Sequence, residues 1–207
     1  SEEGETTVSA RKLFELIKSV PDDTNLNFEV KENQLEISAL SFQADLAILP
    51  VQDFPFVELE DHNFSLNMNG DKFGKVLEST SFAMASADVR YYLNGLLLET
   101  SQKKINLVAT DGHRLAWGSY SCSEDLEEKK IIIPRSTALE LQRILNIFPE
   151  DISFSSNNSQ LKVESDNFTF ISKLIEGAYP DYKKVFPSGE EQSLETSKSP
   201  ILTALSL

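Results

Sequence analysis

The side chains best suited to chemistry gather in residues 106–120, which read NLVATDGHRLAWGSY. Asp111 and His113, with a serine, could supply two members of a hydrolytic triad, but they flank a turn glycine and no nucleophile elbow is present. The two histidines, His62 and His113, are too few for a histidine-rich metal site, and Cys122 has no CxxC partner. We therefore predict a protein that is not an enzyme and that needs no metal and no cofactor.

The residues around this segment predict a β-hairpin. Ile105, Leu107 and Ala109 recur at every second position, which is typical of a largely buried strand. Asp111-Gly112 favours a tight type I′ turn, because glycine tolerates a positive φ, and a second strand should follow from His113. The acidic residues 124–128 lack EF-hand spacing, so we expect a solvated loop there.

Composition is that of a globular protein, with 40% hydrophobic and 25% charged residues in a chain of 207. No apolar run approaches the roughly 18 residues that span a bilayer, and no leader opens the chain, so we expect no membrane partner. A single cysteine favours a reducing compartment, hence a cytoplasmic location. The net charge of −14, taken alone, argues against nucleic-acid binding, because DNA affinity comes largely from lysine and arginine on phosphates.

An internal repeat relates residues 8–55 to residues 133–180, at a spacing of about 125 residues. Each copy has a helix pattern, a Pro-acidic-Asp turn, three strand patterns and an aromatic-Pro stop. Between them lie a strand at 64–68, a helix at 71–86 and strands at 91–100, 104–111 and 113–121. The chain therefore predicts three successive βαβββ units. The alternative is that any α+β protein shows helices followed by strands.

The three predicted helices, at 10–19, 71–86 and 135–147, carry seven basic and four acidic side chains, so the acidic excess lies in the strands and loops. The predicted buried residues are Ala10, Leu13, Phe14 and Ile17 in the first helix and Phe73, Val76 and Leu77 in the second. The basic residues, expected on the outward faces, are Arg11, Lys12, Lys18, Lys72, Lys75, Arg135 and Arg143. On repeated units they predict one surface that faces a polyanion. Lysine on an ordinary solvated helix face is the simpler alternative.

Several long motifs closely resemble the bacterial DNA polymerase III beta subunit family, the sliding clamps. They are ATDGHRLA at 109–116, DVRYYLNGLLLET at 88–100 and SKLIEGAYPDYKKVFP at 172–187. GETTVSARKLFELIKSV at 4–20 and LPVQDFP at 49–55 fit the same family. The resemblance implies an α+β DNA-clamp fold of repeated βαβββ units, with helices on the pore side and antiparallel sheets on the other. It further implies a processivity factor that encircles double-stranded DNA as a head-to-tail homodimer and tethers the replicative polymerase.

The same resemblance suggests how the chain is divided. Residues 1–62 should be the second half of the first clamp domain, residues 63–187 the complete middle domain, and residues 188–207 the beginning of the third. The chain is therefore expected to be a fragment of a longer subunit. The alternative from another class is a structural or oligomerisation protein built on the same repeat without DNA.

The resemblance also assigns the hairpin to a groove that receives short linear peptides from polymerases, the clamp loader and repair proteins. The groove residues that it implies are Arg90, Leu93, Thr110, Gly112, His113, Arg114, Leu115, Pro180, Lys184 and Val185. Leu93, Leu115 and Val185 would form an apolar floor, and Arg90 and Arg114 would hold a carboxylate or carbonyl. Lys184 stands where the family often has arginine, which puts a bidentate contact there in doubt. Without the resemblance, Arg114 and His113 simply cap a sheet and Leu115 is core.

Tyr91 and Tyr92 resemble clamp residues near the rim that touch DNA or a displaced strand. The alternative is that a tyrosine pair at the start of a strand packs within the sheet.

Overall fold

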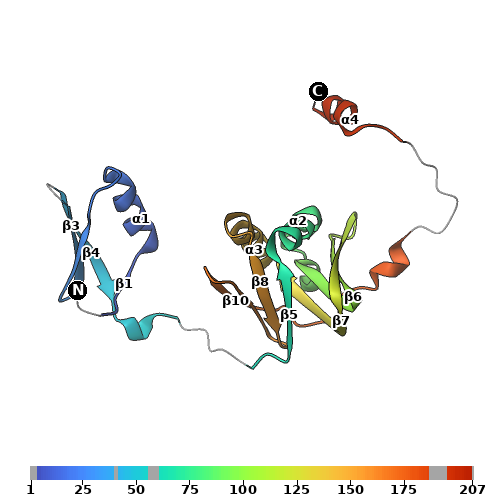
Figure 1. The fold of residues 1–207 in the computed structure, drawn as a ribbon, viewed down its shortest axis with the longest axis horizontal. Coiled ribbons are helices and arrows are strands. Elements are labelled where there is room, and N and C mark those ends of the chain that lie inside the picture. Colours follow the sequence, from blue (N-terminus) through green and yellow to red (C-terminus); the bar gives the residue numbers. More distant parts are fainter. Residues whose placement is uncertain (1–3, 40–41, 56–60, 187–194, 207) are drawn as a thin grey trace. The chain divides into compact units, whose positions relative to one another are not determined.

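The computed structural model describes residues 4–39, 42–55, 61–186 and 195–206 (Figure 1). The chain forms two compact units, residues 1–59 and residues 60–207. Each unit has its own arrangement of helices and antiparallel strands, so the predicted α+β class is confirmed.

The first unit is one βαβββ repeat. Its elements are β1 (Thr7–Val8), α1 (Ala10–Ser19), β2 (Asn27–Lys31), β3 (Gln34–Ala39), β4 (Phe42–Leu49) and the 3-10 turn η1 (Val51–Asp53). The antiparallel sheet has the order β1-β4-β3-β2. Ser9 caps α1 because its side chain accepts a hydrogen bond from the Lys12 N–H.

The helix bounds in this unit are as predicted, but the predicted buried face is right only at Leu13 and wrong at Ala10, Phe14 and Ile17. Leu13 and Leu16 are the α1 residues that pack against the small core of Leu35, Ile37 and Leu46. Ala10 is exposed, Phe14 is 66% exposed and Ile17 is 41% exposed. A core this small covers only the Leu13–Leu16 edge of the apolar stripe.

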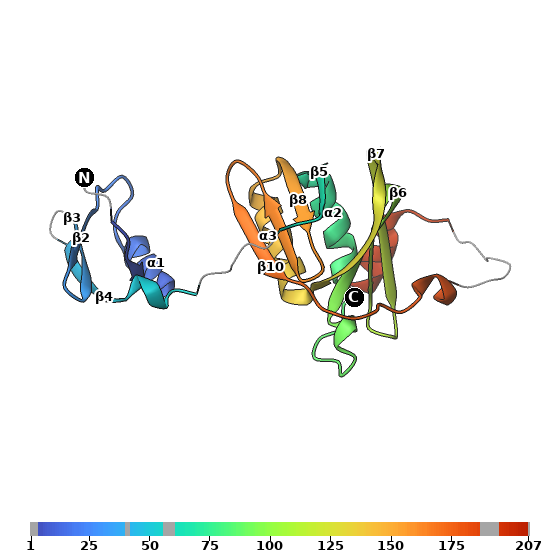
Figure 2. The same ribbon diagram turned by 90° about the horizontal axis from the view of Figure 1, so that it is seen from below.

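In the second unit, helices α2 and α3 lie over the strands (Figures 1 and 2). Its elements are β5 (Phe64–Asn69), α2 (Gly70–Ser81), η2 (Tyr91–Leu93), β6 (Gly95–Thr110), β7 (Leu115–Pro134), α3 (Arg135–Ile147), β8 (Asp151–Ser156), β9 (Gln160–Glu164), β10 (Thr169–Lys173) and η3 (Tyr182–Val185). One sheet has the order β10-β9-β8-β5, and β6 and β7 form an antiparallel ribbon. A further helix, α4 (Lys198–Leu205), follows along the chain.

The ribbon explains how two βαβββ repeats form one unit. Its register shifts between residues 100 and 104, which divides β6 and β7 into two halves each. Residues 104–110 pair with 115–121 within the middle repeat, whereas residues 95–100 pair with 129–134, the first strand of the last repeat. Reciprocally, β5, the first strand of the middle repeat, pairs with β8 of the last one. Each repeat thus gives its first strand to the other.

The larger core of the second unit lies beneath helices α2 and α3. Phe73 and Leu77 of α2 and Leu141 of α3 are fully buried and pack with alternate residues of the strands. Val76, also predicted to be buried, is partly buried at the edge of this core. Helices α2 and α3 lie side by side. They are close at Gly74, where an added Cβ would lie 3.4 Å from Leu145 Cβ.

Four predicted boundaries in this unit are wrong. Helix α2 ends at Ser81 and not at residue 86, because the Thr80 and Ser81 hydroxyls donate to carbonyls of its last turn. Tyr91–Leu93 is a 3-10 turn, so the strand begins at Gly95. The strands expected at 91–100 and 104–111 are one element, β6. The acidic residues 124–128 lie within β7 and not in a loop.

Candidate functional site

The tip of the β6–β7 hairpin is a four-residue loop, and the type I′ turn predicted for it is wrong. Thr110 and Leu115 form the last pair of the ladder. Asp111 Oδ1 accepts hydrogen bonds from the backbone N–H groups of His113 and Arg114, both at 3.0 Å. Gly112 has a φ of 90°. The aspartate side chain therefore shapes the loop, and its backbone donors hold the pKa of the Asp111 carboxyl below its usual value.

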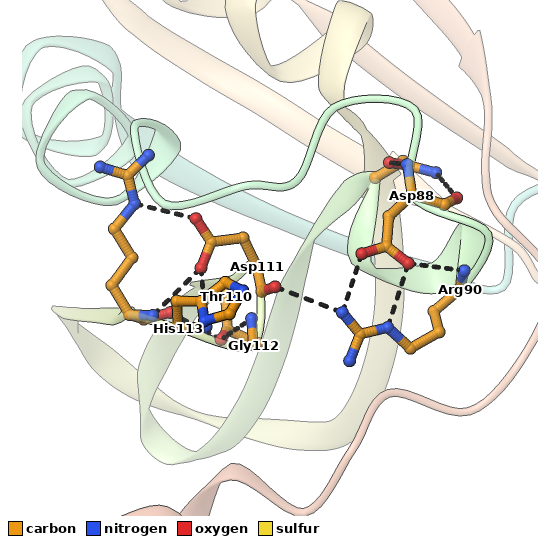
Figure 3. A network of polar contacts seen from close by, with 8 residues as sticks. Asp88, Arg90, Thr110, Asp111, Gly112 and His113 are labelled. Carbon is orange, nitrogen blue, oxygen red and sulfur yellow. Dashed lines mark hydrogen bonds and ion pairs between the residues drawn. The ribbon is translucent and has the colours of Figure 1, made fainter.

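Arg90 fastens the preceding segment to this tip (Figure 3). Its Nε and Nη2 donate to the two carboxylate oxygens of Asp88 at 3.0 and 2.8 Å, and Nη2 also donates to the Asp111 carbonyl at 3.3 Å. The side-chain hydrogen bonds from Arg90 lower the pKa of Asp88 to about 2. A Cβ at Gly112 would lie 3.1 Å from Arg90 Nη2, a tight contact, and the φ of 90° at this position favours glycine.

Arg114 stands on the other side of the tip. Its Nε donates to Asp111 Oδ2 at 3.0 Å, and its guanidinium lies 5.6 Å from the centre of the Phe82 ring. A guanidinium has five N–H donors, so Arg90 and Arg114 both keep donors after these bonds. Asp88 and Asp111 fix the positions of these guanidinium groups. The donors that remain on Arg90 and Arg114 can each bind a carboxylate or a carbonyl oxygen.

The hydrophobic residues expected to form a groove floor differ in how much surface they offer. Leu93 is 2% exposed, so it is part of the interior and the expectation of an open floor there is corrected. Leu115 is half-buried, Pro180 is exposed and Val185 is 66% exposed. The usable apolar surface therefore runs from Leu115 to the 3-10 turn that carries Val185.

A second, small core holds the chain segment 179–186 against the outer face of the hairpin. Leu97, Val108 and Tyr182 are buried in it, and Leu115 and Tyr179 pack against them. The Tyr179 hydroxyl accepts a hydrogen bond from the Thr110 N–H at 3.1 Å. Burial raises the pKa of Tyr179 to about 12, so this hydroxyl keeps its proton at neutral pH. Lys184 forms an ion pair with Asp181 at 3.2 Å.

Glu99 is a buried carboxylate that sequence reasoning missed. It is 4% exposed and accepts a hydrogen bond from the Tyr182 hydroxyl at 2.6 Å. The Lys130 and Lys183 ammonium groups lie 3.0 and 3.6 Å from its oxygens. Burial alone would raise the pKa of Glu99, but the donors from Tyr182 and Lys130 outweigh it and hold the pKa below its usual value. Nothing in the spacing of residues 99, 130 and 182 signals this contact.

The basic side chains of the helices are exposed, with one exception. Arg135 is half-buried and donates from Nη1 to the Met84 carbonyl at 3.0 Å, so the prediction that it faces outward is only partly right. The other six are exposed: Arg11, Lys12 and Lys18 on α1, Lys72 and Lys75 on α2, and Arg143 on α3.

Each of α1, α2 and α3 pairs one of its cations with a carboxylate of the same helix. The distances are 3.1 Å for Arg11 with Glu15, 2.6 Å for Lys75 with Asp71 and 3.1 Å for Arg143 with Glu140. Within the described ranges, the ammonium groups of Lys12, Lys18 and Lys72 form no ion pair. In the second unit, Lys72, Lys75 and Arg143 come from the two helices that lie side by side.

Tyr91 and Tyr92 meet edge to face, with ring centres 5.8 Å apart, and Tyr91 is 58% exposed. They belong to the 3-10 turn, so neither ring packs as part of a strand. Elsewhere in the described part of the chain, no three His, Cys, Asp or Glu side chains form a group that could hold a metal ion. No helix among the described residues is long and apolar enough to cross a membrane.

Repeated βαβββ units with paired helices over antiparallel sheets define a protein of the DNA-clamp class, and comparisons with known proteins agree. Residues 67–181 match the central domain of the DNA polymerase III beta subunit, and residues 1–58 match its N-terminal domain. The chain therefore belongs to the DNA polymerase III beta subunit family.

Relatives and solved structures support this membership. The chain is 39% identical to the beta sliding clamp of Pseudomonas putida over all 207 residues, and 32% identical to that of Escherichia coli over 194 residues. A crystal structure of the beta subunit from Pseudomonas aeruginosa matches with a TM-score of 0.88 at 38% identity over 92% of this chain. A second Pseudomonas aeruginosa clamp, bound to griselimycin, matches with a TM-score of 0.87 at 39% identity over 91% of this chain.

The match covers only part of those proteins. The chain spans 56% of the Pseudomonas putida relative, 53% of the Escherichia coli relative, and 53% and 51% of the two solved chains.

Proposed function

We propose that this chain is part of a sliding clamp, a processivity factor that encircles duplex DNA and tethers DNA polymerases to it. The observation that carries the proposal is the match of two successive clamp domains in chain order. Under this proposal, residues 1–62 complete the first clamp domain, residues 63–187 form the middle domain and residues 188–207 begin the third. The whole subunit forms a head-to-tail homodimer in the bacterial cytoplasm and has no catalytic site of its own.

The role of the helices is to face the DNA. The exposed cations of α1, α2 and α3 answer the objection from the net charge of −14, because they sit on helices while the acidic excess lies elsewhere. Their number is small, and three of them share their charge with a carboxylate on the same helix. Few and weak phosphate contacts suit a ring that must slide, since retention comes from closure and not from affinity. Tyr91 and Tyr92 are proposed as additional DNA contacts at the rim.

The role of the hairpin is to bind partner proteins. Arg90 and Arg114 present donors held in place by aspartates, and the half-buried Leu115 and the exposed Pro180 and Val185 offer apolar surface. The hairpin tip that carries Arg114 also contains Thr110, Gly112 and His113. Lys184 lies on the 3-10 turn η3, which also carries Val185. A groove of this composition suits a short peptide with apolar anchors and a polar end. The proposed partners are the polymerase and the clamp loader.

Retention on DNA tests the ring. The protein from the complete gene is loaded onto nicked circular DNA by its clamp loader, and half of each sample is linearised. We expect the circular sample to keep the protein and the linear sample to lose it, because a ring slides off free ends. Equal loss from both, or strong sequence preference, would contradict the proposal and favour a structural protein without DNA.

Salt dependence tests the helices. The double variant Lys12→Ala, Lys72→Ala should bind DNA more weakly whatever its sequence. The slope of log affinity against log salt concentration should become shallower by about the contribution of two phosphate contacts. The matched control is Lys103→Ala with Lys173→Ala, which removes the same charge from exposed strand positions. Equal effects of the two pairs would show that the helices have no special role.

Griselimycin binding tests the groove. Because a Pseudomonas aeruginosa clamp binds this compound, we expect the protein studied here to bind it, and Val185→Ala to weaken the binding without changing the melting temperature. Val185 is exposed, so its truncation leaves the core intact. Unchanged affinity in Val185→Ala would remove this residue from the groove, and no binding by the unaltered protein would contradict the groove itself.

A further inference from the structure

The outer face of the hairpin continues past the proposed groove into an aromatic pocket. Trp117 lies two residues after Leu115 on β7, so both side chains leave the same face of the strand. Phe186 follows Val185 directly, and its ring meets the Trp117 ring edge to face with centres 6.4 Å apart. A cavity of about 420 Å³ opens here, lined by Lys104, Asn106, Trp117, Tyr182, Lys183 and Phe186.

The two rings are large hydrophobic groups that the fold leaves uncovered. Trp117 is 51% exposed and Phe186 is 50% exposed, although they are fixed against each other and against Tyr182. A rigid, half-exposed aromatic pair is an effective anchor, because binding buries much apolar area and orders few bonds. The pocket thus offers one wall for an incoming ring.

The polar groups beside the rings indicate what kind of ligand fits. Asn106 Oδ1 is buried and has no hydrogen-bond partner among the described residues, and neither has the Ser119 hydroxyl, its neighbour across the ladder. Both atoms are shielded from solvent, so a ligand on the rings does not reach them, and the exposed groups decide what fits. The Lys104 side chain is exposed and forms no ion pair within the described ranges, whereas Lys183 already faces Glu99.

We infer that this pocket, here called the aromatic annex (Lys104, Asn106, Trp117, Phe186), binds an acidic–aromatic extension of the peptide that occupies the groove. The aromatic side chain stacks on Trp117 and Phe186, and the acidic side chain pairs with Lys104. Charge decides the occupant, because the exposed Lys104 leaves a positive charge beside the rings with no ion pair among the described residues, which favours an acidic segment. The inference rests on the proposed groove, which the annex extends.

The experiment compares extended and unextended peptides on the protein from the complete gene. The core probe is the peptide Ac-Ala-Leu-Ala-Leu-Ala-amide, and the extended probes carry Asp-Phe at one end or the other. Each displaces labelled griselimycin. We expect one extended probe to bind roughly tenfold more tightly than the core probe, a gain typical of one well-placed aromatic contact. Trp117→Ala and Phe186→Ala should each abolish that gain and leave the core probe's affinity unchanged.

Two further readouts separate the annex from a general hydrophobic effect. Lys104→Glu should weaken the Asp-Phe probe and favour a Lys-Phe probe, whereas Lys103→Glu, at the neighbouring exposed position, should do neither. Emission from Trp117, taken as the difference between the parent protein and Trp117→Phe, should shift with the extended probe and not with the core probe.

The outcomes distinguish the annex from the groove. If griselimycin does not bind, or the core probe fails to displace it, the proposed groove has failed. If both bind but no extension gains affinity, or the gain survives Trp117→Ala and Phe186→Ala, the annex is refuted and the groove stands. If either variant instead changes the oligomeric state of the protein, the rings form a subunit contact and the annex is again refuted.

Discussion

Removing the Tyr182 hydroxyl should destabilise the second unit while leaving its shape unchanged. Tyr182→Phe removes only the hydroxyl group of a residue that is 6% exposed and packs with Leu97 and Val108. The deleted group donates the 2.6 Å hydrogen bond to Glu99, a carboxylate that is itself buried. A hydrogen bond to a charged group contributes roughly 1.5–3 kcal/mol. Because the lysines at 3.0 and 3.6 Å remain, we expect a loss of about 2 kcal/mol.

Urea denaturation measures this loss. Trp117 lies in the second unit, so its fluorescence follows the unfolding of that unit. The midpoint should fall while the slope of free energy against urea stays constant, as for a change in stability alone. Tyr91→Phe is the matched control, because Tyr91 is 58% exposed and its hydroxyl has no hydrogen bond among the described residues.

The pH dependence gives a second, independent check. The pKa of Glu99 is lowered in the folded protein, so its contribution is complete above its unfolded value of about 4.5 and is lost as the pH falls through the folded pKa. Tyr182→Phe removes one cause of that lowering, so the loss on acidification should begin at a higher pH in the variant. If Tyr182→Phe is as stable as the parent, or if Tyr91→Phe loses as much stability, the hydrogen bond between Glu99 and Tyr182 does not fasten residues 179–186.

Three other predictions concern the hairpin tip. The Asp88 carboxyl should titrate near pH 2 by NMR, so its pairing with Arg90 persists on acidification until the pH falls through that value. Arg90→Ala should return the midpoint of this titration toward 3.8. A midpoint near 3.8 in the parent protein would contradict the pairing. Tyr179→Phe leaves the Thr110 N–H without its acceptor and should cost about 1–3 kcal/mol in urea unfolding, whereas no loss would mean that water replaces the hydroxyl. Gly112→Ala should lower the free energy of unfolding by about 1 kcal/mol or more, because the φ of this residue is 90°. It should also weaken griselimycin binding, because the new methyl group meets the Arg90 guanidinium. Unchanged affinity for griselimycin would exclude the tip from the groove.

Periodicity was a sound guide wherever one core decides burial. The bounds of α1 and α3 agree with the sequence pattern, and Phe73 and Leu77 of α2 are buried as predicted, because a helix face opposite a large core leaves little choice. The same rule failed at Phe14, since the apolar stripe of α1 is wider than the three-residue core beneath it. Hydrophobic spacing identifies a face but not how much of it the rest of the fold covers.

Side-chain hydrogen bonds explain most of the remaining differences. Asp111-Gly112 is a strong signal for a two-residue turn, yet the Asp111 carboxylate accepts two backbone donors and lengthens the loop to four. Arg135 has an outward position in the helix pattern, but the Met84 carbonyl holds it. The Glu99–Tyr182 bond joins residues 83 positions apart, and no local pattern encodes such a distance. Contacts of this kind belong to the tertiary structure.

The exchange of first strands between the two repeats of the second unit has a consequence for how that unit folds. A repeat that ends its sheet on a strand borrowed from its neighbour is incomplete alone, because β8 would expose the edge that β5 now covers. The first unit keeps its first strand, because β1 pairs with β4 of the same repeat. The two repeats of the second unit instead depend on each other for folding, and residues 95–134 form the ribbon that they share.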